Sequence, residues 1–168
     1  MAEPLLRAVR AALTSPAGHP GPAGHAGPGA VVRAGDQILC GCSGGPDSTA
    51  LLLALASLEG ELGFTLRALY VDHGLRPAAQ AEAAAVQRLC AELDVPAEVT
   101  RVRLVPGESL QHAARRARYA ALQEAARRHG ARLIAVGHTR SDQAETLLMR
   151  LLGGAGLRGL GAMAPLRP

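Results

Sequence analysis

The chain has 168 residues, of which 48% are hydrophobic and 19% charged, so it is long enough for one domain with a substantial core and is not disordered. Eighteen basic residues, all arginine, outnumber 14 acidic ones, and the net charge of +4 permits nucleotide or nucleic acid partners without requiring them. No apolar stretch reaches membrane-spanning length and the three cysteines follow no pairing pattern, which predicts a reduced, cytoplasmic protein without a membrane segment.

A helix is expected at the start of the chain. Apolar residues recur there at helical spacing, namely Leu5, Leu6, Val9 and Leu13. Residues 15–30 are rich in glycine, proline and alanine and lack periodicity, which predicts a flexible linker. We therefore expect an N-terminal helix over residues 1–14, a linker over 15–30 and one domain over 31–168.

Strands alternate with helices from residue 31 onward. The strands are expected at 37–42, 64–72, 97–104 and 131–137. The helices are expected at 46–59, 77–93, 109–130 and 139–152, the third of them capped by Ser109 and ended by Gly130. This alternation predicts a doubly wound α/β fold with at least four parallel strands, covered by helices on both faces. Ligands of such sheets bind outside the carboxyl ends of the strands.

The run CSGGPDSTALLL (42–53) places small polar residues between two apolar segments, at the end of the first strand. Residues 43–45 would form the turn, and Pro46 fits the first helical position, where its missing N–H is not needed. The free N–H groups of the helix start would then point at the turn, and the glycines would let backbone amides approach an anion. The run therefore indicates a phosphate-binding loop.

The polar side chains of this run fit the same interpretation. Ser43 and Ser48 add hydroxyl groups, and Asp47 suits a phosphate site if Mg²⁺ lies between its carboxylate and the phosphate. The lysine of a Walker A loop is missing. A simple turn between strand and helix is the alternative.

Three more groups of residues come at the same predicted edge of the sheet. Asp72, His73 and Arg76 follow the second strand, where the alternative is an aspartate that caps the next helix. Arg115 and Arg118 lie three residues apart, where guanidinium groups could bind phosphate oxygens in pairs or could simply be solvated. Asp142 and Glu145, also three apart, begin the last helix, and the alternative is that they complement its dipole.

The segment SGGPDS (43–48) resembles the pyrophosphate loop of the N-type ATP pyrophosphatases, the PP-loop superfamily. Later motifs resemble the catalytic domain of the tRNA(Ile)-lysidine synthetases in order and spacing: VDHGLR (71–76), AARRARY (113–119), GHTRSDQAETLLMRLL (137–152) and GLRGLGAM (156–163). The resemblance covers nearly the whole chain outside the linker. It implies an adenine nucleotide alpha hydrolase-like, Rossmann-like fold with a PP-loop ATP-binding catalytic domain over 31–168.

The resemblance also implies an activity. Lysine would be ligated to C2 of the wobble cytidine of tRNA(Ile) with a CAU anticodon, through an adenylated cytidine, with release of pyrophosphate and then AMP. ATP, Mg²⁺, free L-lysine and the tRNA would be the cofactors and partners.

Particular residues acquire roles by the same resemblance. The ATP-binding residues would be Ser43, Gly44, Gly45, Pro46, Asp47, Ser48, Asp72 and His73. Asp47 would also hold the metal and act in catalysis with Arg115 and Arg118. Lysine would be bound by Asp142 and Glu145, and further candidates are Arg76 and His138.

The chain departs from the family in two places. Ser141 stands where the family usually has the first of two adjacent aspartates, and the sequence stops at Pro168, before the C-terminal RNA-binding domain that the family would have, so that either this is a fragment or the partner domain lies on another chain. We therefore expect this chain to bind ATP but to modify tRNA poorly by itself. Two alternatives remain open: a PP-loop tRNA thiolase, for which Cys40 and Cys42 have the wrong spacing, and a truncated ATP-binding module without catalytic activity.

Overall fold

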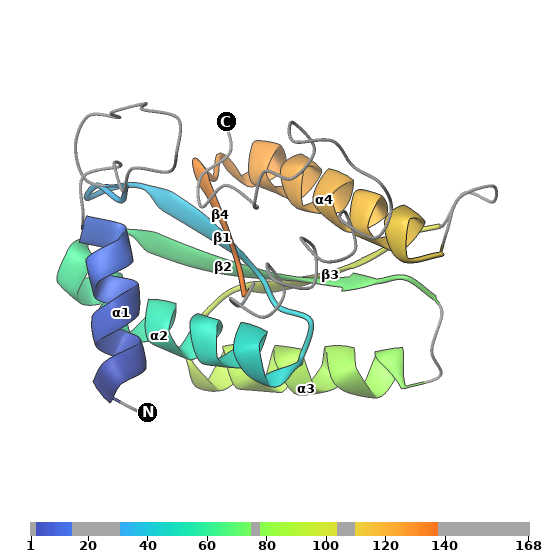
Figure 1. The fold of residues 1–168 in the computed structure, drawn as a ribbon, viewed down its shortest axis with the longest axis horizontal. Coiled ribbons are helices and arrows are strands. Elements are labelled where there is room, and N and C mark those ends of the chain that lie inside the picture. Colours follow the sequence, from blue (N-terminus) through green and yellow to red (C-terminus); the bar gives the residue numbers. More distant parts are fainter. Residues whose placement is uncertain (1–2, 15–30, 75–77, 104–109, 138–168) are drawn as a thin grey trace, which may run out of the picture.

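The computed structural model of the chain describes residues 3–14, 31–74, 78–103 and 110–137 (Figure 1). The predicted linker, the predicted helix over 139–152 and the proposed cap Ser109 lie outside these residues.

Four parallel strands form one sheet in the order β3-β2-β1-β4. Their bounds are Gln37–Gly41 for β1, Thr65–Asp72 for β2, Ala97–Arg101 for β3 and Leu133–Val136 for β4. In the centre of the sheet, Cys40 is paired with Ala68 on one side and with Ala135 on the other. The chain builds outward from β1 to β3 and then returns to the other side of β1, so the direction of winding reverses between β1 and β4.

Helices connect the strands and cover both faces of the sheet. Figure 1 shows α1 (Glu3–Thr14), α2 (Pro46–Leu62) and α3 (Ala79–Glu92) on one face, and α4 (Leu110–His129) on the other. The predicted doubly wound α/β fold is thereby confirmed. No helix in the described part of the chain has the length and apolar character needed to cross a membrane.

The core has two parts because alternate residues of each strand point to opposite faces. On the face of α2 and α3, Ile38 and Cys40 of β1 belong to a large cluster of buried apolar residues. On the face of α4, a smaller cluster consists of Leu39, Leu69, Leu122, Ala125 and Ala126. All three cysteines are buried free thiols in the larger cluster.

Helix α1 packs on the larger cluster through the apolar residues that the sequence placed on one face, Leu6, Val9 and Leu13. The predicted end of α2 was too early. The helix continues to Leu62 and ends where Gly63, with φ 69°, donates its N–H to the carbonyl of Glu59. Gly130, with φ 69°, follows the last residue of α4, as predicted.

Candidate active site

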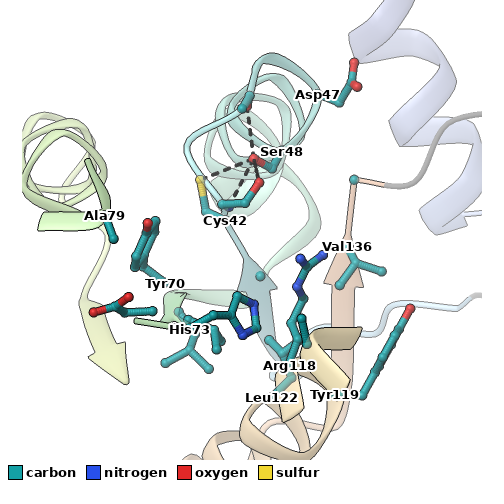
Figure 2. A pocket seen from close by; sticks show the side chains of 18 of the residues that line it. Cys42, Asp47, Ser48, Tyr70, His73, Ala79, Arg118, Tyr119, Leu122 and Val136 are labelled. Carbon is teal, nitrogen blue, oxygen red and sulfur yellow. Dashed lines mark hydrogen bonds between the residues drawn. The ribbon is translucent and has the colours of Figure 1, made fainter. Parts of the chain in front are cut away.

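A pocket of about 400 Å³ lies at the carboxyl ends of β1, β2 and β4, where the winding of the sheet reverses (Figure 2). Its walls come from the ends of three strands and from two helices. The strand ends contribute residues 41–43 and 45–48 at and after the end of β1, 69–73 at the end of β2, and Val136 and Gly137 at the end of β4. The helices contribute Ala79 of α3 and Ala114, Arg118, Tyr119 and Leu122 of α4. The predicted phosphate loop and the predicted residues of β2 and α4 therefore meet at one place.

The turn after β1 is built by glycines and a proline. Gly44 has φ 79°, a left-handed conformation that side chains disfavour. Gly45 is extended and precedes α2 as its N-cap, with no side-chain cap hydrogen bond, and Pro46 follows in the first turn of the helix. The start of α2 therefore faces the pocket without a capping side chain in front of it, as an anion site requires.

Ser48 holds this turn in shape. Its side chain is buried, with 6% of the residue exposed. The hydroxyl accepts the N–H of Ser43 at 3.2 Å and donates to the carbonyl of Gly45 at 3.0 Å. It also lies 3.2 Å from the Ser43 hydroxyl. The Ser48 hydroxyl, which the sequence suggested as a ligand for phosphate, is thus already engaged within the loop, whereas the Ser43 residue is exposed at the pocket.

Asp47 lies at the rim of the pocket. It is exposed in the first turn of α2, and Figure 2 shows its carboxylate pointing away from Ser48 and Arg118. Within the described ranges there is no group of three or more His, Cys, Asp or Glu residues that could hold a metal ion. A single carboxylate fits Mg²⁺ that is bound mainly by nucleotide phosphates and water, and does not fit a metal caged by protein ligands alone.

The two predicted arginines of α4 have different surroundings. Arg118 lines the pocket, and Figure 2 shows its guanidinium group extending toward the side where Ser48 lies. Among the residues that the structure describes, it has no hydrogen-bond or ion-pair partner. Arg115 instead lies over the ring of Tyr119, with its guanidinium carbon 5.3 Å from the ring centroid. The structure thus brings only Arg118 of this pair to the pocket wall.

The residues at the end of β2 also have different roles, since one stabilises the turn and another lines the pocket. Asp72 accepts the N–H of Gly74 at 2.7 Å and lies 3.6 Å from Nε of Arg101, so its carboxylate closes the turn. His73 lines the pocket, and Figure 2 shows its ring beside Arg118. Four other predicted site residues lie outside the described part of the chain: Arg76, His138, Asp142 and Glu145.

Among the pocket residues that the sequence did not single out, two make close contacts that shape the wall. Tyr70, 4% exposed, donates its hydroxyl proton to Glu82 at 2.9 Å. Gly137 lies so close to the start of α2 that a Cβ atom placed on it would be 3.0 Å from both N and Cα of Ser48. A glycine directly after a strand at the ligand-binding edge is the signal that could have indicated this close approach.

Comparisons with known proteins agree with this geometry. The PP-loop domain family matches residues 27–168. The tRNA(Ile)-lysidine synthase of Bordetella parapertussis is 52% identical over 126 residues, which are 74% of this chain and 36% of the relative. The tRNA(Ile)-lysidine synthase of Rhodopseudomonas palustris is 49% identical over 135 residues, which are 79% of this chain and 39% of the relative. The chain thus spans little more than a third of the length of these curated relatives.

One solved structure extends the comparison to the fold. The U34-tRNA thiolase NcsA from Methanococcus maripaludis has a TM-score of 0.73 and 17% sequence identity, with 93% of this chain and 51% of that chain covered. At this identity the similarity shows a shared fold.

Proposed function

The chain belongs to the PP-loop domain family, and from this premise we propose that it is the ATP-binding catalytic part of a tRNA(Ile)-lysidine synthase. The family implies ATP binding. The finer assignment is supported by relatives of that name that are 49% and 52% identical in this part of their sequence.

One observation supports the ATP-binding part of the proposal most directly. The uncapped start of α2 and the guanidinium group of Arg118 border the same pocket, and Arg118 has no polar partner within the described residues. A helix start and an arginine both attract phosphate oxygens, and together they suit the triphosphate of ATP.

In the proposed reaction, O2 of the wobble cytidine attacks the α-phosphorus of ATP. A C–O–P bond forms, the bond between the α-phosphorus and its bridging oxygen breaks, and pyrophosphate leaves. The ε-amine of lysine then attacks C2 of the cytidine, loses a proton, and displaces AMP as the C2–O bond breaks. The residues of this chain position the reactants and offset the phosphate charge, with Arg118 facing the triphosphate.

Mg²⁺ fits this proposal. Asp47 would hold it at the rim of the pocket, together with phosphate oxygens and water. When bound, the ion would reduce the repulsion between the carboxylate and the triphosphate.

Lysine and tRNA would be bound by further residues. We propose Asp142 and Glu145 for the lysine ammonium group, with Arg76 and His138 as further candidates near the nucleotide. We propose Arg115 for the tRNA or the ATP phosphates, because it is near the pocket but not in its wall.

Cysteine chemistry disfavours the thiolase alternative. Burial raises the pKa of the Cys90 thiol to about 11 and raises the pKa of Cys40 even further from its usual range. Reactive cysteines have a lowered pKa and some exposure, because the thiolate is the nucleophile. Cys40, Cys42 and Cys90 are all buried and unsuited to carrying sulfur.

An exchange assay tests the proposal. The chain would be incubated with ATP, Mg²⁺ and labelled pyrophosphate, with and without tRNA(Ile), and the label that enters ATP would be measured. We expect weak exchange, since the chain alone should use tRNA poorly, that depends on tRNA(Ile) and is lost in Arg118→Ala, whereas Arg116→Ala, an exposed neighbour outside the pocket, retains it. Exchange that is independent of tRNA(Ile) would contradict the proposed acceptor, and absence of ATP binding would contradict the whole proposal.

A further inference from the structure

Helix α3 forms the wall behind the phosphate loop (residues 43–48). A Cβ atom placed on Gly44 would lie 3.5 Å from Cγ2 of Val86, 3.8 Å from Cβ of Glu82 and 4.0 Å from the Glu82 carbonyl oxygen. Glu82 and Val86 are one helical turn apart, so they present one face of α3 to the loop. These two residues therefore lie beside Gly44, at van der Waals distance from the position that a side chain would take there.

Glu82 is also connected to strand β2. The Tyr70 hydroxyl donates to Oε2 of Glu82 at 2.9 Å, and Figure 2 shows the Tyr70 ring beside Ala79 of α3. Tyr70 is 4% exposed and lines the pocket, so its hydroxyl depends on a protein partner. This hydrogen bond fixes the first turn of α3 relative to the end of β2.

A first-turn carboxylate commonly serves only to complement the helix dipole. That role is fulfilled equally well by a side chain in solvent. Glu82 instead contacts Tyr70, and its backbone and Cβ flank Gly44. Val86, on the same face of α3, is 3% exposed, so this face belongs to the interior next to the loop.

We propose that Glu82 is a positioning residue for the part of the site that receives the β- and γ-phosphates. The inference rests on the proposed function, because it requires the loop to bind ATP phosphates. Glu82 holds Tyr70 and lies beside Gly44, and we expect this arrangement to keep the loop in its binding conformation before the ligand arrives. Its influence therefore falls on the pyrophosphate end of ATP and not on the adenosine end.

The test compares dissociation constants for pyrophosphate, AMP and ATP, measured by calorimetry in the presence of Mg²⁺. Glu82→Ala and Tyr70→Phe are each expected to raise the Kd for pyrophosphate and ATP about tenfold, the size expected for one lost hydrogen bond at a buried group, and to leave the Kd for AMP unchanged. The double variant is expected to be no worse than either single variant, because both remove the same hydrogen bond. Glu82→Gln keeps an acceptor oxygen and should recover most of the affinity.

Glu92→Ala is the matched control, since Glu92 is exposed at the other end of α3 and lies outside the pocket wall. It should bind all three ligands like the unmodified chain. The inference is overturned if the Glu82 and Tyr70 variants bind pyrophosphate normally, or if their affinity for AMP falls as much as their affinity for pyrophosphate. It is also overturned if the losses of binding free energy in the two single variants add in the double variant. Thermal unfolding checks each variant, and Tyr70→Phe decides the matter if Glu82→Ala does not fold. Failure of the unmodified chain to bind ATP would instead contradict the proposed function.

Discussion

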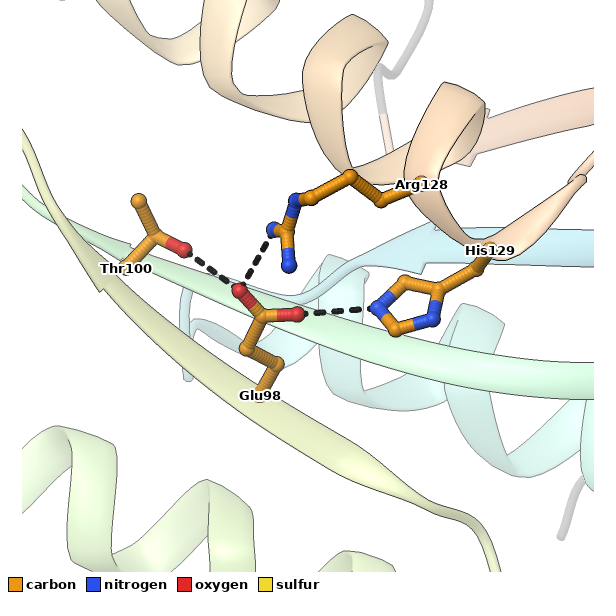
Figure 3. Close-up of polar contacts among 4 residues, drawn as sticks. All are labelled: Glu98, Thr100, Arg128 and His129. Atoms are coloured by element: carbon orange, nitrogen blue, oxygen red, sulfur yellow. Dashed lines mark hydrogen bonds and ion pairs between the residues drawn. The ribbon is translucent and has the colours of Figure 1, made fainter.

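Charged groups near the starts of strands and the cation at the pocket are arranged in opposite ways. Near the start of the edge strand β3, Glu98 accepts hydrogen bonds from Arg128 at 2.7 Å and from Thr100 at 3.0 Å, and lies 3.0 Å from Nε2 of His129 (Figure 3). At the carboxyl end, Arg118 faces the pocket without a polar partner among the described residues. Charges paired within the protein hold elements together, whereas a cation left beside a pocket is available to a ligand.

A pair at the amino end of the sheet shows the same pattern. Asp36, just before β1, is bound by Arg132, just before β4, and it also accepts the N–H of Arg33 at 2.7 Å. The hydrogen bond from Arg132 is the largest cause that lowers the pKa of Asp36 to about 2. The hydrogen bond from Arg128, followed by that from His129, lowers the pKa of Glu98 to about 2. Both carboxylates are therefore ionised and paired within the protein at neutral pH.

The largest effect is expected from a side chain at the carboxyl end. Gly137→Ala would place a Cβ atom 3.0 Å from the backbone of Ser48, so the start of α2 must shift and the phosphate loop with it. We expect ATP affinity to fall by more than tenfold and the free energy of unfolding to fall by about 1–3 kcal/mol. Calorimetry and urea unfolding measure the two quantities.

Gly60→Ala is the control for this change. Gly60 lies within α2, and a Cβ atom there would meet nothing within 4 Å. Alanine should stabilise the helix by about 0.5–1 kcal/mol and leave ATP binding unchanged. Equal behaviour of the two alanine variants would show that the close approach at Gly137 has no role in the site.

Replacing an arginine of each kind by alanine tests the comparison directly. Arg118→Ala should weaken ATP binding about tenfold to a hundredfold, as expected for a lost charge-assisted hydrogen bond, with little change in stability. Arg128→Ala should lower the stability and leave ATP binding unchanged, because it removes a partner of Glu98 and Arg128 is not a residue of the pocket wall. ATP titration and urea unfolding of both variants test this, and a loss of stability in Arg118→Ala equal to that in Arg128→Ala would contradict the distinction.

A smaller effect is expected when the pH is lowered, because the paired carboxylates then lose their charge. Asp36 and Glu98 have folded-state pKa values lowered to about 2, so the stability that they contribute is present above their unfolded values and is lost as pH falls toward 2. Each should contribute about 1 kcal/mol after solvent screening. Urea unfolding between pH 6 and pH 3 should therefore show a shallower pH dependence for Glu98→Gln than for the unmodified chain. An unchanged slope would mean that the Glu98 pair does not stabilise the fold.

Local patterns in the sequence predicted most of the fold. Alternating apolar runs indicated the four strands, and Gly130 marked the end of α4. The early end assigned to α2 had a local cause, since Gly60 interrupts the helical pattern three residues before the real terminator, Gly63. The helix passes through Gly60, where an added Cβ atom would meet nothing within 4 Å.

The site was predictable where it depends on neighbours in sequence and not where it depends on distant contacts. The turn at the pocket, with Pro46 in the first turn of the following helix, could be predicted from residues 43–48 alone. The close approach of Gly137 to Ser48 joins residues far apart in the chain, and so does the position of Glu82 beside Gly44. Helical spacing put Arg115 and Arg118 on one face, but the ring of Tyr119 lies under Arg115 and only Arg118 borders the pocket.

The burial of the cysteines has a use that lies outside the chemistry of the site. Cys40 and Cys90 lie between the sheet and the helices α2 and α3 and outside the pocket wall, and the cluster under α4 contains no cysteine. A thiol reagent can reach these two only when that side of the molecule opens, so the rate of labelling at them reports the free energy of this opening. Detachment of α4 alone would leave the thiols protected. The native thiols therefore distinguish opening of the layer formed by α2 and α3 from detachment of α4.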